Sequence, residues 1–133
     1  MMELTRVYHF SAAHRLVNPA LSAEENAHLY GPCAELHGHN YELEVTVVGR
    51  PDPVTGMIVD IAQVDERVGE IVDRVDHRTL EDVAGLAGVI TTGECLARVF
   101  WRALAPGVGA AALARVAVVE TANNRFEYRG ESS

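Results

Sequence analysis

CAELHGHNYELEVTVVG, from Cys33 to Gly49, combines two sequence patterns that meet at His39. From Tyr41 onward apolar and polar residues alternate, which is typical of a β-strand with one buried face. His37 and His39 are two residues apart, so on an extended backbone their side chains point to the same face, with Cα atoms about 6.5–7 Å apart. Because imidazole is the commonest metal ligand in proteins and catalytic zinc takes three protein ligands, this stretch predicts two ligands of a metal site.

The length and composition of the chain indicate one globular domain. The chain has 133 residues, of which 48% are hydrophobic and 23% charged, so it can build a substantial core. We expect a single domain over residues 1–133. No apolar run approaches the roughly 20 residues that span a bilayer, and the N-terminus does not read as a signal peptide, so we expect a cytoplasmic protein without membrane contact.

The charge inventory narrows the classes of partner. A formal net charge of -8 disfavours nonspecific binding to nucleic acid. All eleven basic residues are arginine, so an anionic substrate has to be held by arginine, backbone N–H groups or helix ends. The two cysteines, Cys33 and Cys95, lie in different sequence contexts, and a structural disulfide is not expected in the cytoplasm.

The hydrophobic periodicity predicts the order strand, strand, helix, helix, strand, strand. This order indicates an α+β domain whose four-stranded antiparallel sheet carries two helices on one face. Asp60 is the expected N-cap of the first helix, and Thr91 with Glu94 is the expected capping box of the second. The expected elements are strands at residues 4–13, 40–49, 114–120 and 125–130, helices at 60–76 and 91–104, and a long loop at 15–32 with a helical turn near 22–26.

A third metal ligand is available at the end of the first predicted strand. If the first two strands pair antiparallel, the end of one lies beside the start of the other, and His14 joins His37 and His39. The alternative is that His14 only ends a strand and His37 is a surface residue. Cys33 is either a fourth ligand, which would close the site, or a thiolate beside the metal.

Two further positions carry groups suited to proton transfer or binding. Asp76 and His77 lie at a predicted helix end, where they form either a carboxylate-oriented base or only a helix stop favoured by the helix dipole. Glu120 shares strand parity with Val116 and Val118, the presumed buried set, so its carboxylate needs a partner. That partner is either an arginine across the strands or the donor edge of a heterocycle.

The chain resembles the 6-pyruvoyl-tetrahydropterin synthase and 6-carboxytetrahydropterin synthase family over nearly its whole length. Six motifs occur in the family's order, and together they are far more specific than any one alone. They are FSAAH (residues 10–14), CAELHGHNY (33–41), DPVTGMIVD (52–60), DHRTL (76–80), TTGE (91–94) and VETANNRFEYRGE (119–131).

The resemblance implies a fold and an assembly. The family has the tunnelling fold, or T-fold, in which each subunit contributes a four-stranded antiparallel sheet with two helices on one face. Three such sheets join into a barrel, and two trimers stack into a homohexamer with active sites between subunits. Barrel closure would also remove the open edges of a small sheet.

The resemblance also assigns roles to residues. It implies Zn²⁺ bound by His14, His37 and His39, and a lyase that eliminates triphosphate from the pterin substrate 7,8-dihydroneopterin triphosphate. The implied catalytic residues are Cys33, Asp76 and His77, and the implied substrate-binding residues are Glu120 as the pterin anchor with Glu94, Thr91 and Thr92.

The resemblance covers two kinds of enzyme, which differ in the tetrahydropterin that they release. Three residues separate Cys33 from His37, which resembles the 6-carboxy enzymes of queuosine biosynthesis, whereas the long loop and the ETANN segment resemble the 6-pyruvoyl enzymes of tetrahydrobiopterin biosynthesis. The thiol spacing favours 6-carboxy-5,6,7,8-tetrahydropterin; the alternatives are the 6-pyruvoyl product, an aldolase-type lyase, or a non-catalytic zinc-stabilised pterin-binding homologue. Cys95 stands where the family usually has Asn, and Arg15, Arg78 and Arg125 are candidate triphosphate ligands.

Overall fold

The computed structural model describes residues 1–131, so the predicted domain of residues 1–133 extends two residues beyond the described part. Its framework is a pair of long strands, β1 (Met2–His14) and β2 (His37–Gly49), which pair antiparallel along their whole length. The alternation along both strands turns one set of side chains toward the core, where Phe10 stacks on Tyr41 with ring centroids 4.8 Å apart. Both strands are longer than predicted, and β2 includes the two histidines.

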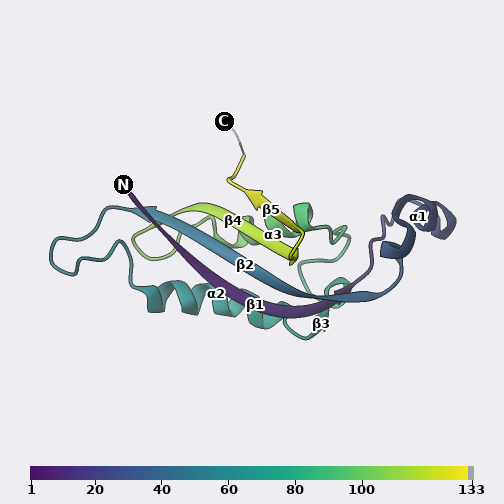
Figure 1. Ribbon diagram of the computed structural model, residues 1–133, viewed down its shortest axis with the longest axis horizontal. Coiled ribbons are helices and arrows are strands. Elements are labelled where there is room, and N and C mark those ends of the chain that lie inside the picture. The colour runs from purple at the N-terminus through teal and green to yellow at the C-terminus, as the bar shows by residue number, and fades with distance from the viewer. Residues whose placement is uncertain (132–133) are drawn as a thin grey trace.

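The sheet is antiparallel except at one edge. β4 (Ala112–Thr121) pairs with β2, and β5 (Asn124–Tyr128) pairs with β4. A two-residue strand, β3 (Arg78–Thr79), pairs parallel to the end of β1, so the strand order is β3-β1-β2-β4-β5 (Figure 1). The predicted four-stranded sheet therefore has a fifth, very short member, which two residues in a predicted loop could not reveal.

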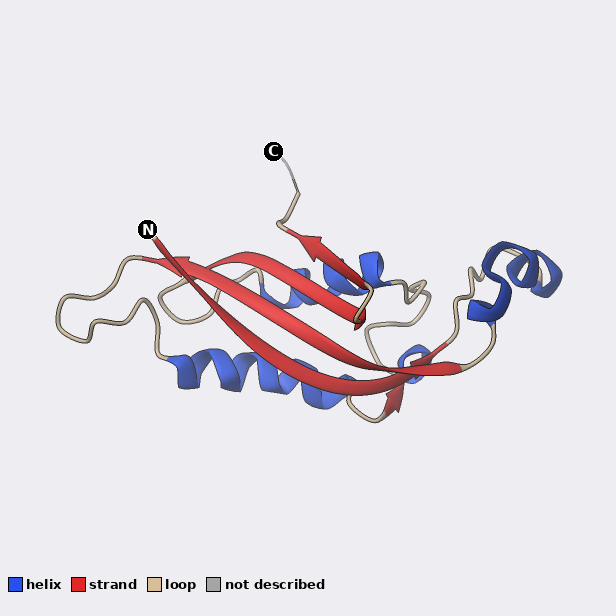
Figure 2. Ribbon diagram, viewed as in Figure 1, coloured by secondary structure: helices blue, strands red, loops and turns tan. Residues whose placement is uncertain are grey.

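Two helices pack on the inward face of the sheet (Figure 2). α2 (Ile61–Val75) begins at the predicted cap Asp60, whose carboxylate accepts the Ala62 N–H at 2.9 Å. α3 (Gly93–Leu104) follows it along the chain and lies against β4 and β5. Each helix buries one apolar stripe, and each large apolar side chain in it stabilises the fold by about 1.5–3 kcal/mol. The buried stripe of α2 is Val64, Val68, Ile71 and Val75, and that of α3 is Leu96, Ala97, Phe100 and Leu104.

The predicted capping box of α3 is wrong by one residue. The N-cap is Thr92, whose hydroxyl accepts the Cys95 N–H at 3.2 Å, so Cys95 rather than Glu94 occupies the third helical position. Thr91 is instead buried and turned toward β1, where it contacts His14. The capping-box rule favours Thr91, which has Glu94 three residues on, but the long-range contact of Thr91 with His14 leaves Thr92 as the cap.

The predicted long loop contains an additional helix. α1 (Ala23–Tyr30) starts at a capping box between Ser22 and Glu25 and is followed by a 3-10 helix, η1 (Gly31–Ala34). α1 lies beyond the end of the β1–β2 pair, apart from the rest of the molecule (Figure 1). Only the polar side chain of Asn26 is buried in it, through bonds to backbone atoms of the same loop. α1 therefore lacks the apolar stripe by which α2 and α3 could be predicted.

The outward face of the sheet carries charged residues. Glu44 on β2 accepts hydrogen bonds from Arg115 on β4 and Arg125 on β5, at 2.8 and 2.6 Å. Glu127 bonds to both of these arginines as well. Arg125, a candidate triphosphate ligand, is thus already paired within the chain. None of the helices formed by residues 1–131 has both the length and the apolar character needed to cross a bilayer.

Candidate active site

Three imidazoles converge at the end of the β1–β2 ladder, as the sequence predicted. His14 and His37 form its last residue pair, and His39 lies opposite Ala12 on the same face. The ring centroids are 4.5 Å apart for His14 and His37, 5.1 Å for His14 and His39, and 4.9 Å for His37 and His39. One nitrogen from each ring lies within 4.8 Å of the other two, so the three side chains could hold a metal ion.

Backbone carbonyls orient two of the three rings. The Nδ1 atom of His14 is 2.9 Å from the Thr91 carbonyl oxygen, and that of His37 is 2.7 Å from the Glu35 carbonyl oxygen. A carbonyl only accepts, so both Nδ1 atoms carry the proton and both Nε2 atoms present a lone pair. The Tyr41 hydroxyl lies 3.4 Å from the Nε2 atom of His14, a long contact that a metal ion would replace. The buried Nε2 atom of His39 has no hydrogen-bond partner within residues 1–131. These nitrogens therefore fit a metal ion, which would accept their lone pairs.

The surroundings favour neutral rings, the form that binds metals. Burial lowers the pKa of the His14 imidazole below its ordinary value, and the neighbouring His37 lowers it further. Burial also lowers the pKa of His39, although the negative charge of Glu120 opposes this shift. The buried Tyr41 ring forms the floor beneath the cluster, with its centroid 5.4 Å from that of His39 and 6.1 Å from that of His14.

Glu120, which is part of β4, lies beside the three histidines. Its Oε1 atom is 3.4 Å from the His39 Nε2 atom, and its side chain is largely shielded from solvent. Within residues 1–131, a histidine nitrogen lies near this carboxylate without a hydrogen bond to it, and the cross-strand arginine considered from the sequence is not its partner. A carboxylate here leaves acceptor oxygens next to the three imidazoles.

Asp76 and His77 form a preassembled pair at the end of α2. The Asp76 Oδ1 atom accepts from His77 Nδ1 and from the Ser11 backbone N–H, both at 2.9 Å. The Ser11 bond lowers the pKa of the Asp76 carboxyl, and the His77 bond lowers it further. Neighbours in sequence can face each other because His77 adopts a positive φ of 58°, which its N–H stabilises by bonding to the Ser11 carbonyl at 2.6 Å. The turn that such a pairing requires is thus present, and the His77 side chain is 82% exposed.

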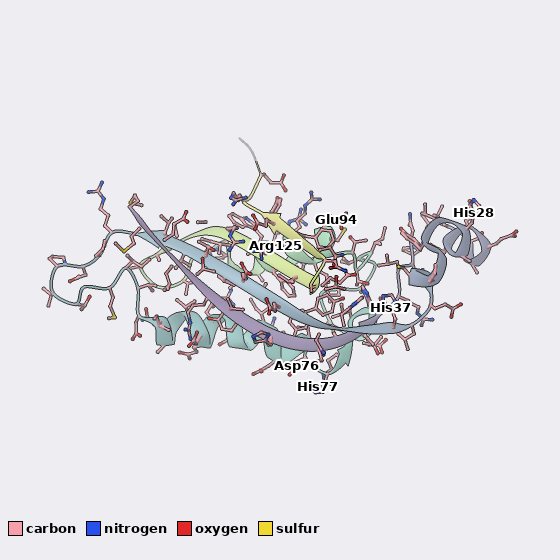
Figure 3. The ribbon with its side chains drawn as sticks, in the orientation of Figure 1. His28, His37, Asp76, His77, Glu94 and Arg125 are labelled. Atoms are coloured by element: carbon pink, nitrogen blue, oxygen red, sulfur yellow. The ribbon has the colours of Figure 1, made fainter. Side chains whose placement is uncertain are left out.

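Cys33 lies in η1, with its thiol exposed. Its carbonyl accepts the Leu16 N–H at 2.8 Å, which fixes the start of η1 to the chain beyond β1. Within residues 1–131, the group of side chains placed to hold a metal consists of the three histidines without Cys33. Asp76 and His77 lie on the outer side of β1, well apart from His37 (Figure 3). Within this chain the Asp–His pair and His37 therefore do not meet at a single point (Figure 3).

The TTGE segment lies directly behind the histidine cluster. Thr91 is 1% exposed and bonds to His14, whereas Thr92 caps α3 and Glu94 is exposed on its first turn. Gly93 is required here, because a Cβ atom would lie 2.0 Å from the Cδ2 atom of Phe126 on β5. The roles of Thr91, Thr92 and Glu94 in substrate binding stay predictions.

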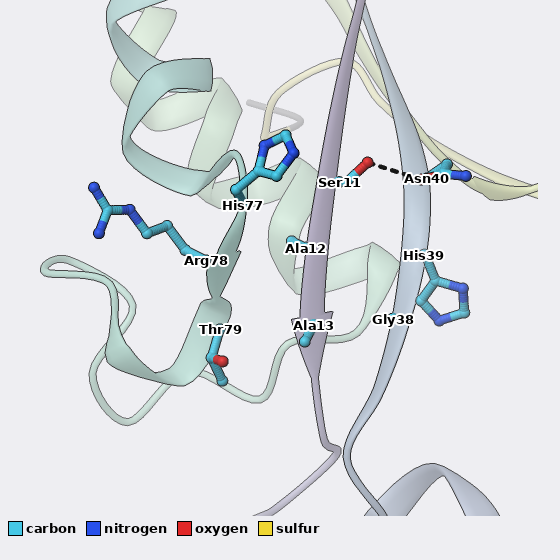
Figure 4. Close-up of a pocket in the computed structure, with 9 residues that line it drawn as sticks. All are labelled: Ser11, Ala12, Ala13, Gly38, His39, Asn40, His77, Arg78 and Thr79. Atoms are coloured by element: carbon cyan, nitrogen blue, oxygen red, sulfur yellow. Dashed lines mark hydrogen bonds between the residues drawn. The ribbon is translucent and has the colours of Figure 1, made fainter.

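A hollow of about 460 Å³ lies across the end of β1 (Figure 4). His77 and His39 border it from opposite sides of β1, and Arg78 extends beside it (Figure 4). The Ser11 hydroxyl donates to the Asn40 side-chain oxygen at 2.7 Å on its wall. Arg78 is therefore the candidate triphosphate ligand that borders a cavity near the Asp–His pair.

Sequence reasoning missed Glu81, which lies behind the cluster. Its Oε1 atom accepts from the Arg15 N–H at 3.0 Å and from the Thr91 hydroxyl at 2.9 Å. An acidic residue in a predicted loop carries no signal of such a contact, since its partners lie 66 and 10 positions away.

Comparison with known proteins agrees with this fold. The family model described as 6-pyruvoyl tetrahydropterin synthase matches residues 3–131. The chain is 43% identical to the 6-pyruvoyl tetrahydrobiopterin synthase of Dictyostelium discoideum, covering 96% of each, and 41% identical to that of Homo sapiens, covering 97% of this chain and 92% of the relative. It is 27% identical to the 6-carboxy-5,6,7,8-tetrahydropterin synthase of Aquifex aeolicus, covering 97% of this chain and 98% of that one.

A solved structure shows the same architecture. The 6-pyruvoyl tetrahydropterin synthase of Caenorhabditis elegans superposes with a TM-score of 0.91 at 36% identity, covering 98% of this chain and 96% of that one. The T-fold and the three-histidine cluster define a pterin-processing lyase. The chain belongs to the 6-pyruvoyl tetrahydropterin synthase family.

Proposed function

We propose that the protein converts 7,8-dihydroneopterin triphosphate to 6-pyruvoyl-tetrahydropterin with elimination of triphosphate. The relatives at 41–43% identity are named as 6-pyruvoyl enzymes, and the 6-carboxy enzyme is at 27%. These identities favour the pyruvoyl product over the carboxy product that the Cys33–His37 spacing favoured. A single spacing therefore has less weight than similarity along the whole chain.

The observation that carries the proposal is the cluster of His14, His37 and His39. Two rings present an Nε2 lone pair, and the third has a buried nitrogen without a hydrogen-bond partner, so we propose that these residues hold Zn²⁺ with one position open. When bound, the ion would act as a Lewis acid toward the oxygens of the substrate side chain and make the neighbouring C–H bond more acidic.

The protein groups proposed to move protons are Cys33, Asp76 and His77. Asp76 holds the Nδ1 proton of His77, so the exposed Nε2 atom is the one that exchanges a proton with substrate. The exposed Cys33 thiol provides a second proton-exchanging group, and the elimination needs one group to remove a proton and another to deliver one.

Carboxylates and threonines are proposed to hold the pterin. The oxygens of Glu120 accept hydrogen bonds from the ring N–H and amino group of a pterin, which places the heterocycle beside His39. Glu94, Thr91 and Thr92 are proposed to complete this binding site, Thr91 through its backbone and its contact with His14.

We also propose that the site is completed by a second copy of the chain, in a homohexamer built as a dimer of trimers. The support is the separation of the Asp76–His77 pair from the histidine cluster (Figure 3) and the open edge of β1, which β3 covers only at Ala12 and Ala13. Mixing inactive Cys33→Ala and His77→Ala chains tests this, because hybrid oligomers should regain part of the activity. No regain after exchange of subunits would contradict a shared site.

The proposed reaction is tested with zinc-loaded protein and 7,8-dihydroneopterin triphosphate, following products by mass spectrometry. We expect free triphosphate and 6-pyruvoyl-tetrahydropterin in equal amounts. The carboxy product with a two-carbon aldehyde would identify the other enzyme of the family, and turnover of the unphosphorylated pterin would indicate an aldolase-type lyase. Tight pterin binding without turnover would support the non-catalytic homologue.

Cys33→Ala is the control for the role of the thiol. It should lose turnover while keeping one zinc per chain, because the thiol lies outside the histidine cluster. Loss of zinc together with stability would mean that Cys33 is a fourth ligand.

A further inference from the structure

The carboxylate of Glu81 contacts the environment of His14 at two points. Glu81 lies in the 3-10 helix η2 (Leu80–Asp82), after β3. Its Oε1 atom accepts the backbone N–H of Arg15, the residue after His14, at 3.0 Å. The same atom accepts the hydroxyl of Thr91 at 2.9 Å. One oxygen therefore fixes both the chain beside His14 and the residue that holds its ring.

Thr91 transmits this restraint to the imidazole. Its carbonyl oxygen accepts the His14 Nδ1 proton at 2.9 Å, and its hydroxyl oxygen lies 3.2 Å from the same nitrogen. Because the hydroxyl proton points to Glu81, that oxygen presents only its lone pairs to His14. Both Thr91 atoms are thus acceptors, and they favour the tautomer with the proton on Nδ1 and the lone pair on Nε2.

The arrangement is costly for folding alone. The second carboxylate oxygen of Glu81, Oε2, is buried and has no hydrogen-bond partner within residues 1–131. A buried acceptor without a partner destabilises the folded state, and a charged one does so more strongly. An apolar residue of the same size would avoid this cost but would leave the buried Thr91 hydroxyl without its acceptor, so the carboxylate matters through the bonds that it makes to Thr91 and Arg15.

We propose that Glu81 is a positioning residue for the metal ligand His14, acting through Thr91 and the Arg15 N–H. This inference rests on the proposed function in that it takes the three histidines as the metal site. Partners that orient a ligating histidine typically change metal affinity 10–100-fold when removed. Glu81 touches neither metal nor substrate, so its effect is on the direction and the tautomer of the His14 ring.

The test is the zinc dissociation constant, measured by chelator competition without substrate. Glu81→Met fills the same space with an apolar side chain and removes the acceptor, and we expect its dissociation constant to rise at least about 10-fold. Glu81→Gln keeps an acceptor oxygen for both donors and should stay within about 3-fold of the wild type. Asp82→Asn, which changes the exposed neighbouring carboxylate, is the matched control and should not alter zinc binding.

A second readout separates positioning from a purely structural role. In ¹⁵N NMR spectra of the zinc-free protein, His14 should be the Nδ1-protonated tautomer in the wild type and in Glu81→Gln, and a mixture of tautomers in Glu81→Met. Unfolding by urea measures the stability of Glu81→Met separately, and its transition should stay cooperative, so that weaker zinc binding is not a consequence of unfolding.

The inference is overturned if Glu81→Met leaves both the zinc dissociation constant and the His14 tautomer unchanged. It is also overturned if Glu81→Gln weakens zinc binding as much as Glu81→Met, because then the shared acceptor is not what matters. Neither readout involves the pterin, so a protein without synthase activity would disprove the proposed reaction and leave this test intact.

Discussion

His14 and His37 lie directly opposite each other in the final pair of the β1–β2 ladder, with ring centroids 4.5 Å apart. The pairing joins residues separated by a segment that carries α1 and η1, so the metal-site candidate exists only when the two strands are in this register. A shift by one residue would turn His14 to the opposite face from its partners. The same register places Phe10 on Tyr41, which couples the site to the core.

Replacing one of the three histidines should remove the metal. His39→Ala leaves two imidazoles. We expect zinc affinity to fall by more than about 100-fold, because the loss of only a supporting contact already lowers it about 10–100-fold. The measurement is metal content after dialysis, with binding titrated by chelator competition. His9→Ala, at an exposed position on the outward face, is the control and should retain one zinc per chain.

The Asp76–His77 pair should govern the rate rather than the metal. Asp76→Asn can still accept the Ser11 N–H but no longer stabilises a charged imidazole, so kcat should fall by roughly 10²–10⁴-fold, as when other catalytic histidines lose their carboxylate. Steady-state kinetics and zinc analysis on the same preparation check this. An unchanged kcat at full zinc content would contradict a role of Asp76 in proton transfer.

The sequence was most informative where one pattern dominates. The alternation in β1 and β2 predicted both strands, and their expected antiparallel pairing predicted that His14 meets His37 and His39. The apolar stripes of α2 and α3 likewise predicted both helices. These features follow from local periodicity together with one topological rule, so a single sequence suffices to find them.

Features that depend on distant contacts escaped the sequence. The local capping-box rule favours Thr91, but the bonds of Thr91 to Glu81 and His14 hold it elsewhere, so Thr92 caps the helix. α1 was predicted only as a helical turn near residues 22–26 within a loop, because polar contacts such as those of Asn26, and no apolar stripe, hold it in place. The product also lay beyond local patterns, since the Cys33–His37 spacing and overall similarity favour different enzymes.

Gly93 should be intolerant of any side chain. A Cβ atom there would lie 2.0 Å from the Phe126 ring, so Gly93→Ala has to displace β5 or α3 and should cost about 1–3 kcal/mol in the free energy of unfolding. Urea denaturation measures this. Gly69 of α2 is the matched control, since a Cβ atom there meets no atom within 4 Å and Gly69→Ala should stabilise by about 0.5–1 kcal/mol.

The charged face of the sheet should make stability depend on pH through Glu44. Hydrogen bonds from Arg125 and Arg115 lower the pKa of Glu44 in the folded protein below its ordinary value. Its contribution is therefore fully present above the pKa of an unfolded glutamate, near 4.3, and is lost as the pH falls through the lower folded value. At pH 7, Glu44→Gln should cost about 1.5–3 kcal/mol, the usual contribution of hydrogen bonds to a charged group.

This cost should shrink as the solution is acidified. Once Glu44 is protonated in both states, the wild type and Glu44→Gln should unfold with similar free energies, because both then present an uncharged side chain to the two arginines. Urea titrations at intervals from pH 7 to pH 3 measure the difference between the two proteins. Glu66→Gln, at an exposed position of α2, is the control and should differ from the wild type by less than about 0.5 kcal/mol throughout. A cost for Glu44→Gln that stays constant over this range would show that the arginines stabilise the sheet by packing rather than through the charge of Glu44.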